Sequence, residues 1–107
     1  MLRSIGVSVM LSLLASPVLA ADPATQYTNA CLACHGADGA GVMPGVPDLS
    51  EPDGPLAKPD DLLVQAVIGG AGDPATGAAM PPKGGAPDLT ESDIRALIRY
   101  MRREFLD

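Results

Sequence analysis

The segment CLACH, residues Cys31 to His35, constrains this chain more than any other part of its 107 residues. Two thiols separated by two residues and followed at once by an imidazole form the signature of covalent haem attachment. At helical spacing Cys31 and Cys34 lie about one turn apart, so both sulfurs can reach vinyl groups on one edge of a porphyrin. His35 is then placed to ligate the iron from one face. The segment predicts haem c bound through Cys31 and Cys34, with His35 as an axial ligand.

Three other uses of paired cysteines fit the sequence less well. A dithiol redox motif lies in a βαβ context, and this chain has no β-rich run. A zinc site takes about four ligands, so a carboxylate would have to complete the set. A structural disulfide across so short a loop gives the smallest gain in chain entropy. The chain has only 2 cysteines, and both lie in this segment, so haem attachment is the favoured interpretation.

The first twenty residues have the pattern of a cleaved secretory signal peptide. Arg3 gives a basic start, residues 5–14 are apolar apart from Gly and Ser, and Val18 and Ala20 put small residues at positions −3 and −1 of a cleavage site. The apolar stretch is shorter than the roughly 20 residues that span a bilayer, which argues against a retained anchor. We expect cleavage after Ala20, export to the periplasm, and one domain formed by residues 21–107.

Charge and composition narrow what this domain can bind. The whole chain carries a formal charge of −6, and the signal peptide contains one basic residue and no acidic one, so the mature domain carries −7. Such a surface is a poor partner for nucleic acid and for an anionic membrane face. With no Trp, one Phe and two Tyr, the chain also lacks large core side chains. A buried porphyrin would supply the missing apolar area.

Hydrophobic periodicity and turn residues predict an all-α domain with long loops. One helix is expected over 23–34, because Pro23 suits a first helical position. A second should begin at Pro59, where paired carboxylates follow, and should stop at the glycine pair 69–70. The intervening loops, 36–55 and 71–85, are rich in Gly and Pro, and loops of this length are uncommon in a compact domain unless they are functional.

The last helix has the clearest signals. Thr90 is a good N-cap, and Asp93 three residues later can complete a capping box. Apolar residues then recur at helical spacing: Ile94, Leu97, Ile98, Met101 and Phe105. Three arginines, Arg99, Arg102 and Arg103, crowd the C-terminal end, where positive charge complements the helix dipole.

The second axial ligand of the iron is expected to be Met80. Two of the 5 methionines leave with the signal peptide, and Met101 lies on the apolar stripe of the last helix, where a core role is the better interpretation. Met43 follows His35 so closely that its loop would have to double round the porphyrin edge. Met80 lies beyond a complete helix, and the two prolines after it stiffen its loop. A His/Met pair raises the potential and favours electron transfer over oxygen binding.

Taken together, these motifs resemble those of the class I c-type cytochromes, especially the small bacterial single-haem branch. The matching segments are Cys31-Leu32-Ala33-Cys34-His35-Gly36, Pro47-Asp48-Leu49, Met80-Pro81-Pro82-Lys83-Gly84-Gly85 and the last helix with Tyr100. The resemblance covers nearly all of residues 21–107. It implies the cytochrome c fold, with three to four short helices enclosing one haem and with Tyr27 and Tyr100 near the crossing of the first and last helices.

The resemblance also implies two further haem contacts. In the family a proline carbonyl accepts the ring N–H of the proximal histidine, which orients the imidazole. Pro47 is the candidate for that role and Pro44 the runner-up, while Leu49 would pack on the haem. The chain departs from the family in having no Trp, a residue that often supports a propionate there, so the sequence leaves open what holds the propionates.

The expected function is that of a soluble electron carrier and not of an enzyme. It would pass one electron between redox proteins in small, transient encounters, as a monomer, without nucleic acid and without membrane insertion of the mature chain. Lys83, the one basic residue near Met80, is a candidate contact for such a partner. Two alternatives stay open: a haem c enzyme or gas sensor with a displaceable distal Met, and a cytochrome subunit bound tightly to an oxidoreductase complex. The chain has no second His after His35 and few acid–base groups near Met80, which favours the carrier over the enzyme.

Overall fold

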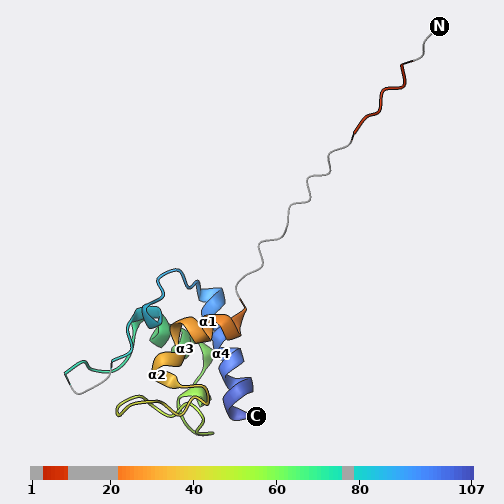
Figure 1. Cartoon of the computed structure of the whole chain (residues 1–107). Helices are drawn as coiled ribbons and strands as arrows, with labels where there is room; N and C mark the ends of the chain where they lie inside the picture. Colours follow the sequence, from red (N-terminus) through yellow and green to blue (C-terminus); the bar gives the residue numbers. More distant parts are fainter. Residues whose placement is uncertain (1–3, 10–21, 76–78) are drawn as a thin grey trace.

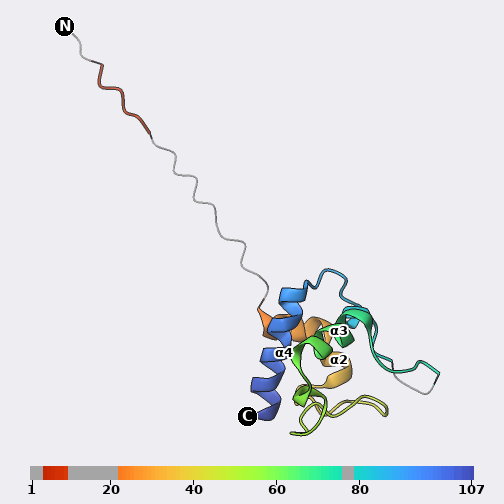
Figure 2. The same ribbon diagram turned by 180° about the vertical axis from the view of Figure 1, so that it is seen from behind.

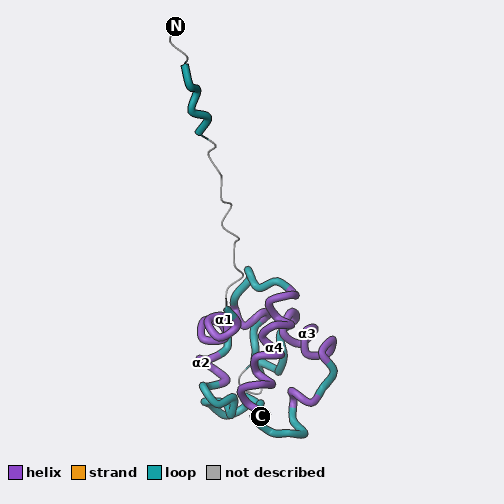
Figure 3. Tube along the Cα trace, turned by 90° about the vertical axis from the view of Figure 1, so that its right-hand side faces the viewer, coloured by secondary structure: helices purple, strands orange, loops and turns teal. Residues whose placement is uncertain are grey.

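The computed structural model describes residues 4–9, 22–75 and 79–107. These residues form four α-helices, α1 (Pro23–Ala30), α2 (Leu32–His35), α3 (Asp60–Gly69) and α4 (Glu91–Leu106), and two short 3-10 turns, η1 (Pro55–Ala57) and η2 (Pro82–Gly85) (Figure 1). Long loops join them, and the described part of the chain contains no strand (Figure 3). The predicted all-α class is confirmed.

Most of the expected signal peptide, with its cleavage site after Ala20, lies outside the described residues. Within those that are described, no helix has both the length and the apolar character needed to cross a bilayer.

The longest helix, α4, packs against both α1 and α3, and it lies between them in Figure 3. On the α1 side, Tyr27 is only 3% exposed. The centroid of its ring lies 5.7 Å from that of Tyr100 and 5.5 Å from that of Phe105, both on α4. The predicted crossing of the first and last helices near Tyr27 and Tyr100 is therefore confirmed, and Figure 2 shows it from behind.

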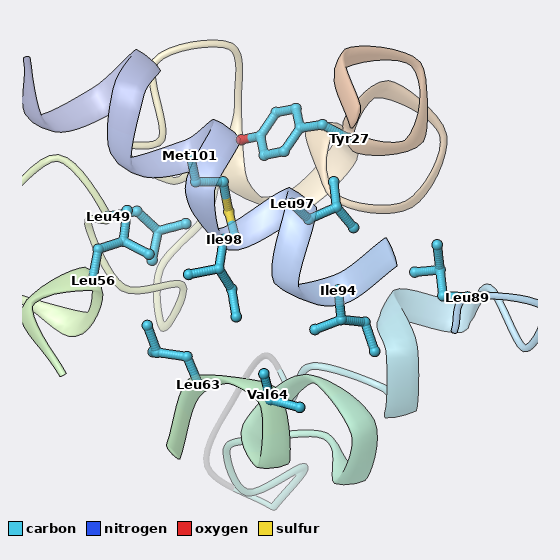
Figure 4. Close-up of a cluster of buried hydrophobic side chains, with 10 residues drawn as sticks. All are labelled: Tyr27, Leu49, Leu56, Leu63, Val64, Leu89, Ile94, Leu97, Ile98 and Met101. Atoms are coloured by element: carbon cyan, nitrogen blue, oxygen red, sulfur yellow. The ribbon is translucent and has the colours of Figure 1, made fainter. Parts of the chain in front are cut away.

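On the α3 side, apolar side chains face each other across the interior. Leu63 of α3 points toward Ile98 of α4, and Val64 points toward Ile94 (Figure 4). All four are buried, and Ile94 is the most completely enclosed, at 0% exposed. The apolar stripe predicted on α4, including a core role for Met101, is confirmed.

The ends of α3 and α4 follow the local sequence. At the start of α4 the Thr90 hydroxyl accepts the backbone N–H of Asp93, whose carboxylate accepts the backbone N–H of Thr90, so the predicted capping box is confirmed. Helix α3 begins at Asp60 and ends at Gly69, followed by Gly70 with a φ of 83°. A positive φ is natural for glycine and halts a helix.

The prediction of one continuous helix before and through the CLACH segment is wrong. The segment expected as a single helix over 23–34 is broken at Cys31, whose φ of −120° and ψ of −35° separate α1 from α2. A new helix starts there, with Cys31 as its N-cap residue, and the backbone N–H groups of Cys34 and His35 both donate to the Cys31 carbonyl oxygen, at 3.3 and 2.9 Å. Apolar periodicity does not mark a change of backbone dihedrals at a single residue.

Candidate functional site

A cavity of about 540 Å³ lies within the fold, which is in the size range of pockets that hold cofactors. Helices α3 and α4 supply most of its apolar wall, with Leu62, Leu63, Ala66, Val67, Ile94, Leu97, Ile98 and Met101. The rest of the lining comes from the CLACH segment, the 47–58 segment, the segment before and within η2, and Leu89 before α4. Every long loop of the domain therefore contributes to one apolar cavity, as expected of loops with a function.

The structure brings together most of the site residues that the sequence predicts. Cys31, His35, Pro47, Leu49 and Met80 all line the cavity. Their positions were inferred from three segments far apart in the chain, and the fold places them on one surface.

Two further residues that the sequence analysis considered do not lie with the residues that line the cavity. Cys34 shares α2 with His35 but is exposed and is not part of the lining. Met43, the rejected candidate for the second ligand, is 44% exposed and also does not line the cavity. This arrangement supports Met80 over Met43, although ligation itself stays a prediction.

His35 has the properties of a metal-binding imidazole. Its Nδ1 atom is buried and has no hydrogen-bond partner among the described residues, and such a polar atom is costly to leave unpaired. Burial lowers the pKa of the His35 ring, which keeps the imidazole neutral, the form that binds metals. No hydrogen bond joins the ring to Pro47 or Pro44 in the structure, so the carbonyl partner of His35 also stays a prediction.

The two cysteines do not resemble a reactive dithiol or a disulfide. Both thiols are free, and burial, followed by the nearby Cys34, raises the pKa of Cys31 to about 11. A redox-active cysteine instead needs a lowered pKa and the strands of a βαβ unit, which the described residues lack. The described residues also contain no group of three or more His, Cys, Asp and Glu suited to a metal ion, so the zinc alternative gains no support.

The C-terminal end of helix α2 is held by hydrogen bonds from both sides of the CLACH segment in the sequence. The Tyr27 hydroxyl donates a buried hydrogen bond of 2.6 Å to the carbonyl oxygen of Gly36. The following loop folds back over the helix, where the backbone N–H of Gly41 donates to the His35 carbonyl at 2.9 Å and that of Val42 to the Cys34 carbonyl at 3.0 Å. These bonds satisfy carbonyls that a helix end leaves free, and they fix His35 in the cavity wall.

The Met80 segment is held against the end of α3 by an antiparallel bridge that the sequence did not predict. Ala71 and Met80 exchange two backbone hydrogen bonds, of 3.1 and 2.7 Å. Gly70 makes this approach possible, because a Cβ at that position would lie 2.6 Å from the Met80 carbonyl oxygen. The bridge places Met80 in the cavity wall directly beside the helix that forms much of it.

On the other side of Met80, η2 packs against the end of α1. Gly84 has a φ of 62°, and a Cβ there would lie 2.6 Å from the carbonyl oxygen of Ala30. Lys83 is the only described residue other than glycine with a positive φ, at 54°. The Pro-Pro-Lys-Gly-Gly run after Met80 therefore encodes a tight turn that lies close to the CLACH segment.

Arg102 has a role that the sequence did not indicate. It was interpreted as a charge that complements the α4 dipole, but its guanidinium reaches across to the segment before α3. There it donates to the carbonyl of Leu56 at 3.1 Å and of Lys58 at 2.9 Å, and it pairs with the carboxylate of Asp60. Leu56 and Lys58 both line the cavity, so Arg102 fastens part of its wall to α4. No local sequence signal marks contacts between residues more than 40 positions apart.

The donor set and the cavity fit a covalently held haem. A neutral imidazole with an unpartnered nitrogen and a thioether, two ligand types that proteins offer to haem iron, lie on the wall of one apolar cavity together with a cysteine that could attach the porphyrin.

Comparison with known proteins agrees with this geometry. A family model described as "Cytochrome C oxidase, cbb3-type, subunit III" matches residues 18–101, which is most of the chain. A search of curated proteins found no match to this chain. The matched span includes the CLACH segment, Met80 and most of α4, and the described helices are those expected of the cytochrome c fold. The chain thus belongs to the family of cbb3-type cytochrome c oxidase subunit III cytochrome domains and is a c-type cytochrome.

Proposed function

We propose that this cytochrome passes single electrons between redox proteins through one haem c, attached to Cys31 and Cys34 and ligated by His35 and Met80. The observation that carries the proposal is the shared cavity: His35 and Met80, 45 positions apart in the sequence, line the same apolar space with Cys31. We place the chain in the small single-haem branch of class I cytochromes, because the Met-Pro-Pro-Lys-Gly-Gly run forms the tight turn next to Met80.

Bound haem would supply a one-electron Fe(III)/Fe(II) couple, and the chain's own residues set its environment. The buried, neutral ring of His35 offers a nitrogen to the iron. The Met80 thioether, a soft ligand, favours the reduced state. The aliphatic walls from α3 and α4 exclude water, which lowers the reorganisation that accompanies a change of charge.

An enzymatic role has less support. Apart from His35 and Cys31, the ionisable side chains among the described residues that line the cavity are Lys58 and Lys83. None of the carboxylates in the described ranges lines the cavity, where one could serve as a general base or acid. The proposal is therefore an electron carrier that makes and breaks no bond.

For location and partners, we propose an exported, periplasmic protein whose signal peptide is cleaved after Ala20. Its encounters with redox partners would be transient, and the mature chain would be a monomer that neither inserts into a membrane nor binds nucleic acid. The acidic charge of the chain suits partners with basic surfaces. Lys83 is less available than the sequence suggested, since its ammonium donates to the carbonyl of Pro87 at 3.3 Å.

A second candidate is a subunit bound tightly to an oxidoreductase complex. The matching family takes its description from a subunit of an oxidase, and this observation favours the alternative. If the native protein elutes from a sizing column at the mass of one mature chain, which is lower than the 10.9 kDa of the uncleaved chain, the free carrier is supported. Co-elution with other haem proteins would favour the subunit.

The ligand assignment is tested by a matched pair of methionine variants. In the oxidised protein, iron–sulfur ligation gives a weak absorption band near the red edge of the visible spectrum. Met80→Ala should abolish this band and open the reduced iron to carbon monoxide, whereas Met43→Ala, at an exposed position outside the cavity, should change neither. Survival of the band in Met80→Ala would show that another residue is the ligand.

A further inference from the structure

The cavity that would hold the haem is almost free of charge, yet a haem carries two propionate carboxylates. Among the described residues that line the cavity, the positively charged ones are Lys58 and Lys83. Burying a carboxylate without a partner is costly, and this chain has no Trp to donate to one. The two lysines are therefore the candidates to receive the propionates, and their surroundings differ.

The backbone of Lys58 is fixed at the rim of the cavity. The residue lies between η1 and α3, and its carbonyl accepts the Nη2–H of Arg102 at 2.9 Å. A second bond, of 3.1 Å from Nε of Arg102 to the carbonyl of Leu56, holds the preceding turn. The point from which the Lys58 side chain leaves the backbone is thus set by α4, which reduces the entropy lost when its ammonium binds an anion.

The carboxylates closest to Lys58 in the sequence already have other partners. Asp60 pairs with Arg102, and Asp61 accepts the Nη2–H of Arg95 at 2.8 Å. The ammonium of Lys58 has no hydrogen bond or ion pair within the described part of the chain. Among the described residues that line the cavity, Lys58 is therefore the lysine whose ammonium is available to bind an anion.

Lys83 is engaged elsewhere. Its backbone adopts the left-handed conformation of η2, with a φ of 54°, and its ammonium donates to the carbonyl of Pro87 on its own loop at 3.3 Å. An anion in the cavity would have to share this ammonium with the Pro87 carbonyl. The comparison favours Lys58.

We propose that the ammonium of Lys58 pairs with a haem propionate and replaces the tryptophan that supports this group in related cytochromes. The inference rests on the proposed haem function and assigns one further contact of the same site. Charge-assisted bonds of this kind are about twice as strong as neutral ones, and Arg102 acts as a positioning residue for Lys58.

The test is a redox titration of the haem-loaded protein between pH 5 and pH 9, for the wild type and for Lys58→Gln, Lys58→Arg and Lys83→Gln. An ionised propionate stabilises Fe(III), so the potential falls as the propionate loses its proton. With an ammonium beside it, the propionate stays ionised throughout this range. The remaining charged groups near the site, Lys83 on η2 and the Asp60–Arg102 pair between α3 and α4, are present in both Lys58 variants.

Lys58→Gln should therefore acquire one pH-dependent step more than the wild type, because the pKa of the propionate that has lost its partner rises into the range. Lys58→Arg, which keeps the charge, and Lys83→Gln should follow the wild type. A Lys58→Gln curve that superimposes on the wild type, or a step that appears in Lys83→Gln instead, overturns the proposal.

The wild type itself provides a second measurement that does not depend on whether a variant folds. The proton NMR shifts of the propionate methylenes should show one propionate that does not titrate between pH 5 and pH 9. Titration of both overturns the proposal. If the wild type holds no covalent haem or shows no reversible couple, the proposed function fails; a normal couple with an unaltered Lys58→Gln curve removes only the Lys58 contact.

Discussion

The hydroxyl of Tyr27 donates a hydrogen bond of 2.6 Å to the carbonyl oxygen of Gly36, the residue that directly follows the CLACH segment. Through this bond, α1 holds the far end of α2 and hence the orientation of His35. Burial raises the pKa of Tyr27 well above its usual value, so the phenol stays protonated and remains a donor at any physiological pH. The crossing of α1 and α4 is thereby connected to the site.

Tyr27→Phe should destabilise the haem-loaded protein by about 1–2 kcal/mol, because it leaves the buried Gly36 carbonyl without a donor. Tyr100→Phe is the matched control, since its ring belongs to the same aromatic cluster but no hydrogen bond of its hydroxyl is seen among the described residues. Urea denaturation followed by the haem absorption measures both. Equal midpoints for the two variants would contradict a specific role for the Tyr27 hydroxyl.

Gly84→Ala should destabilise the fold more than Gly85→Ala. Both glycines have a positive φ, 62° and 81°, and alanine in that region costs roughly 1–2 kcal/mol at either position. Only at Gly84 would the new Cβ also meet backbone, the Ala30 carbonyl oxygen at 2.6 Å, while nothing lies within 4 Å at Gly85. Overpacking adds about 1–3 kcal/mol.

The comparison of these two alanine variants in one thermal or urea series isolates the contact between η2 and α1. Because η2 follows Met80, the Gly84 variant should also weaken the red-edge band of the oxidised protein. Similar stability in both variants would mean that the approach of η2 to α1 is not tight in solution.

Arg102→Leu should loosen the wall of the cavity, because the carbonyls of Leu56 and Lys58 lose their donor. A loss of about 1–3 kcal/mol is expected, because the Leu56 carbonyl is partly buried and is left unpaired. Arg99→Leu removes a charge from the same helix at an exposed position and is the control. Urea denaturation reports the stability, and faster binding of carbon monoxide to the reduced Arg102 variant would report the looser wall. If Arg99→Leu lowers the free energy of unfolding as much as Arg102→Leu does, the loss of net charge is responsible, and not the bonds from Arg102 to the carbonyls of Leu56 and Lys58.

The capping box of α4 should contribute to stability in a pH-dependent way. The hydrogen bonds from the backbone and side chain of Thr90 lower the pKa of the Asp93 carboxyl, so the ionised form favours the folded state. Its contribution is complete above the unfolded pKa of about 3.9 and is lost as the pH falls through the lower, folded value. Asp93→Ala should therefore be less stable than the wild type at pH 7, and the difference should shrink below about pH 4.

Urea midpoints at pH 7, 5, 4 and 3 check this dependence, with Asp88→Ala in the preceding turn as the control. A difference between Asp93→Ala and the wild type that stays constant down to pH 3 would rule out the ionised carboxylate as its source.

Local signals explain why so much of the fold could be predicted from the sequence. The Thr90–Asp93 cap, the apolar stripe of α4 and the Gly70 stop each depend on residues within a few positions of one another. The sequence also singled out His35 and Met80 as candidate ligands, because CLACH is a chemical signature and because Met80 is the methionine separated from it by a full helix; their ligation stays a prediction. The structure confirms that His35 and Met80 line the same cavity.

Features that depend on contacts between distant residues could not be predicted. The bridge between Ala71 and Met80 requires a close approach across Gly70, and Arg102 reaches a segment more than 40 positions away. The break at Cys31 is a change of backbone dihedrals at one residue, which apolar periodicity does not register. The carbonyl partner of the His35 ring, expected at Pro47, also depends on loop geometry that the sequence does not encode locally.

The most direct test of the account is a reduced-minus-oxidised absorption spectrum of the exported protein, combined with a potentiometric titration. We expect haem that stays attached in denaturant through Cys31 and Cys34, a single one-electron transition at the positive potential typical of His/Met ligation, and no binding of carbon monoxide to the reduced protein at neutral pH. Haem that is extracted by denaturant, or a reduced iron that binds carbon monoxide rapidly in the wild type, would contradict a closed His35–Met80 electron-transfer site.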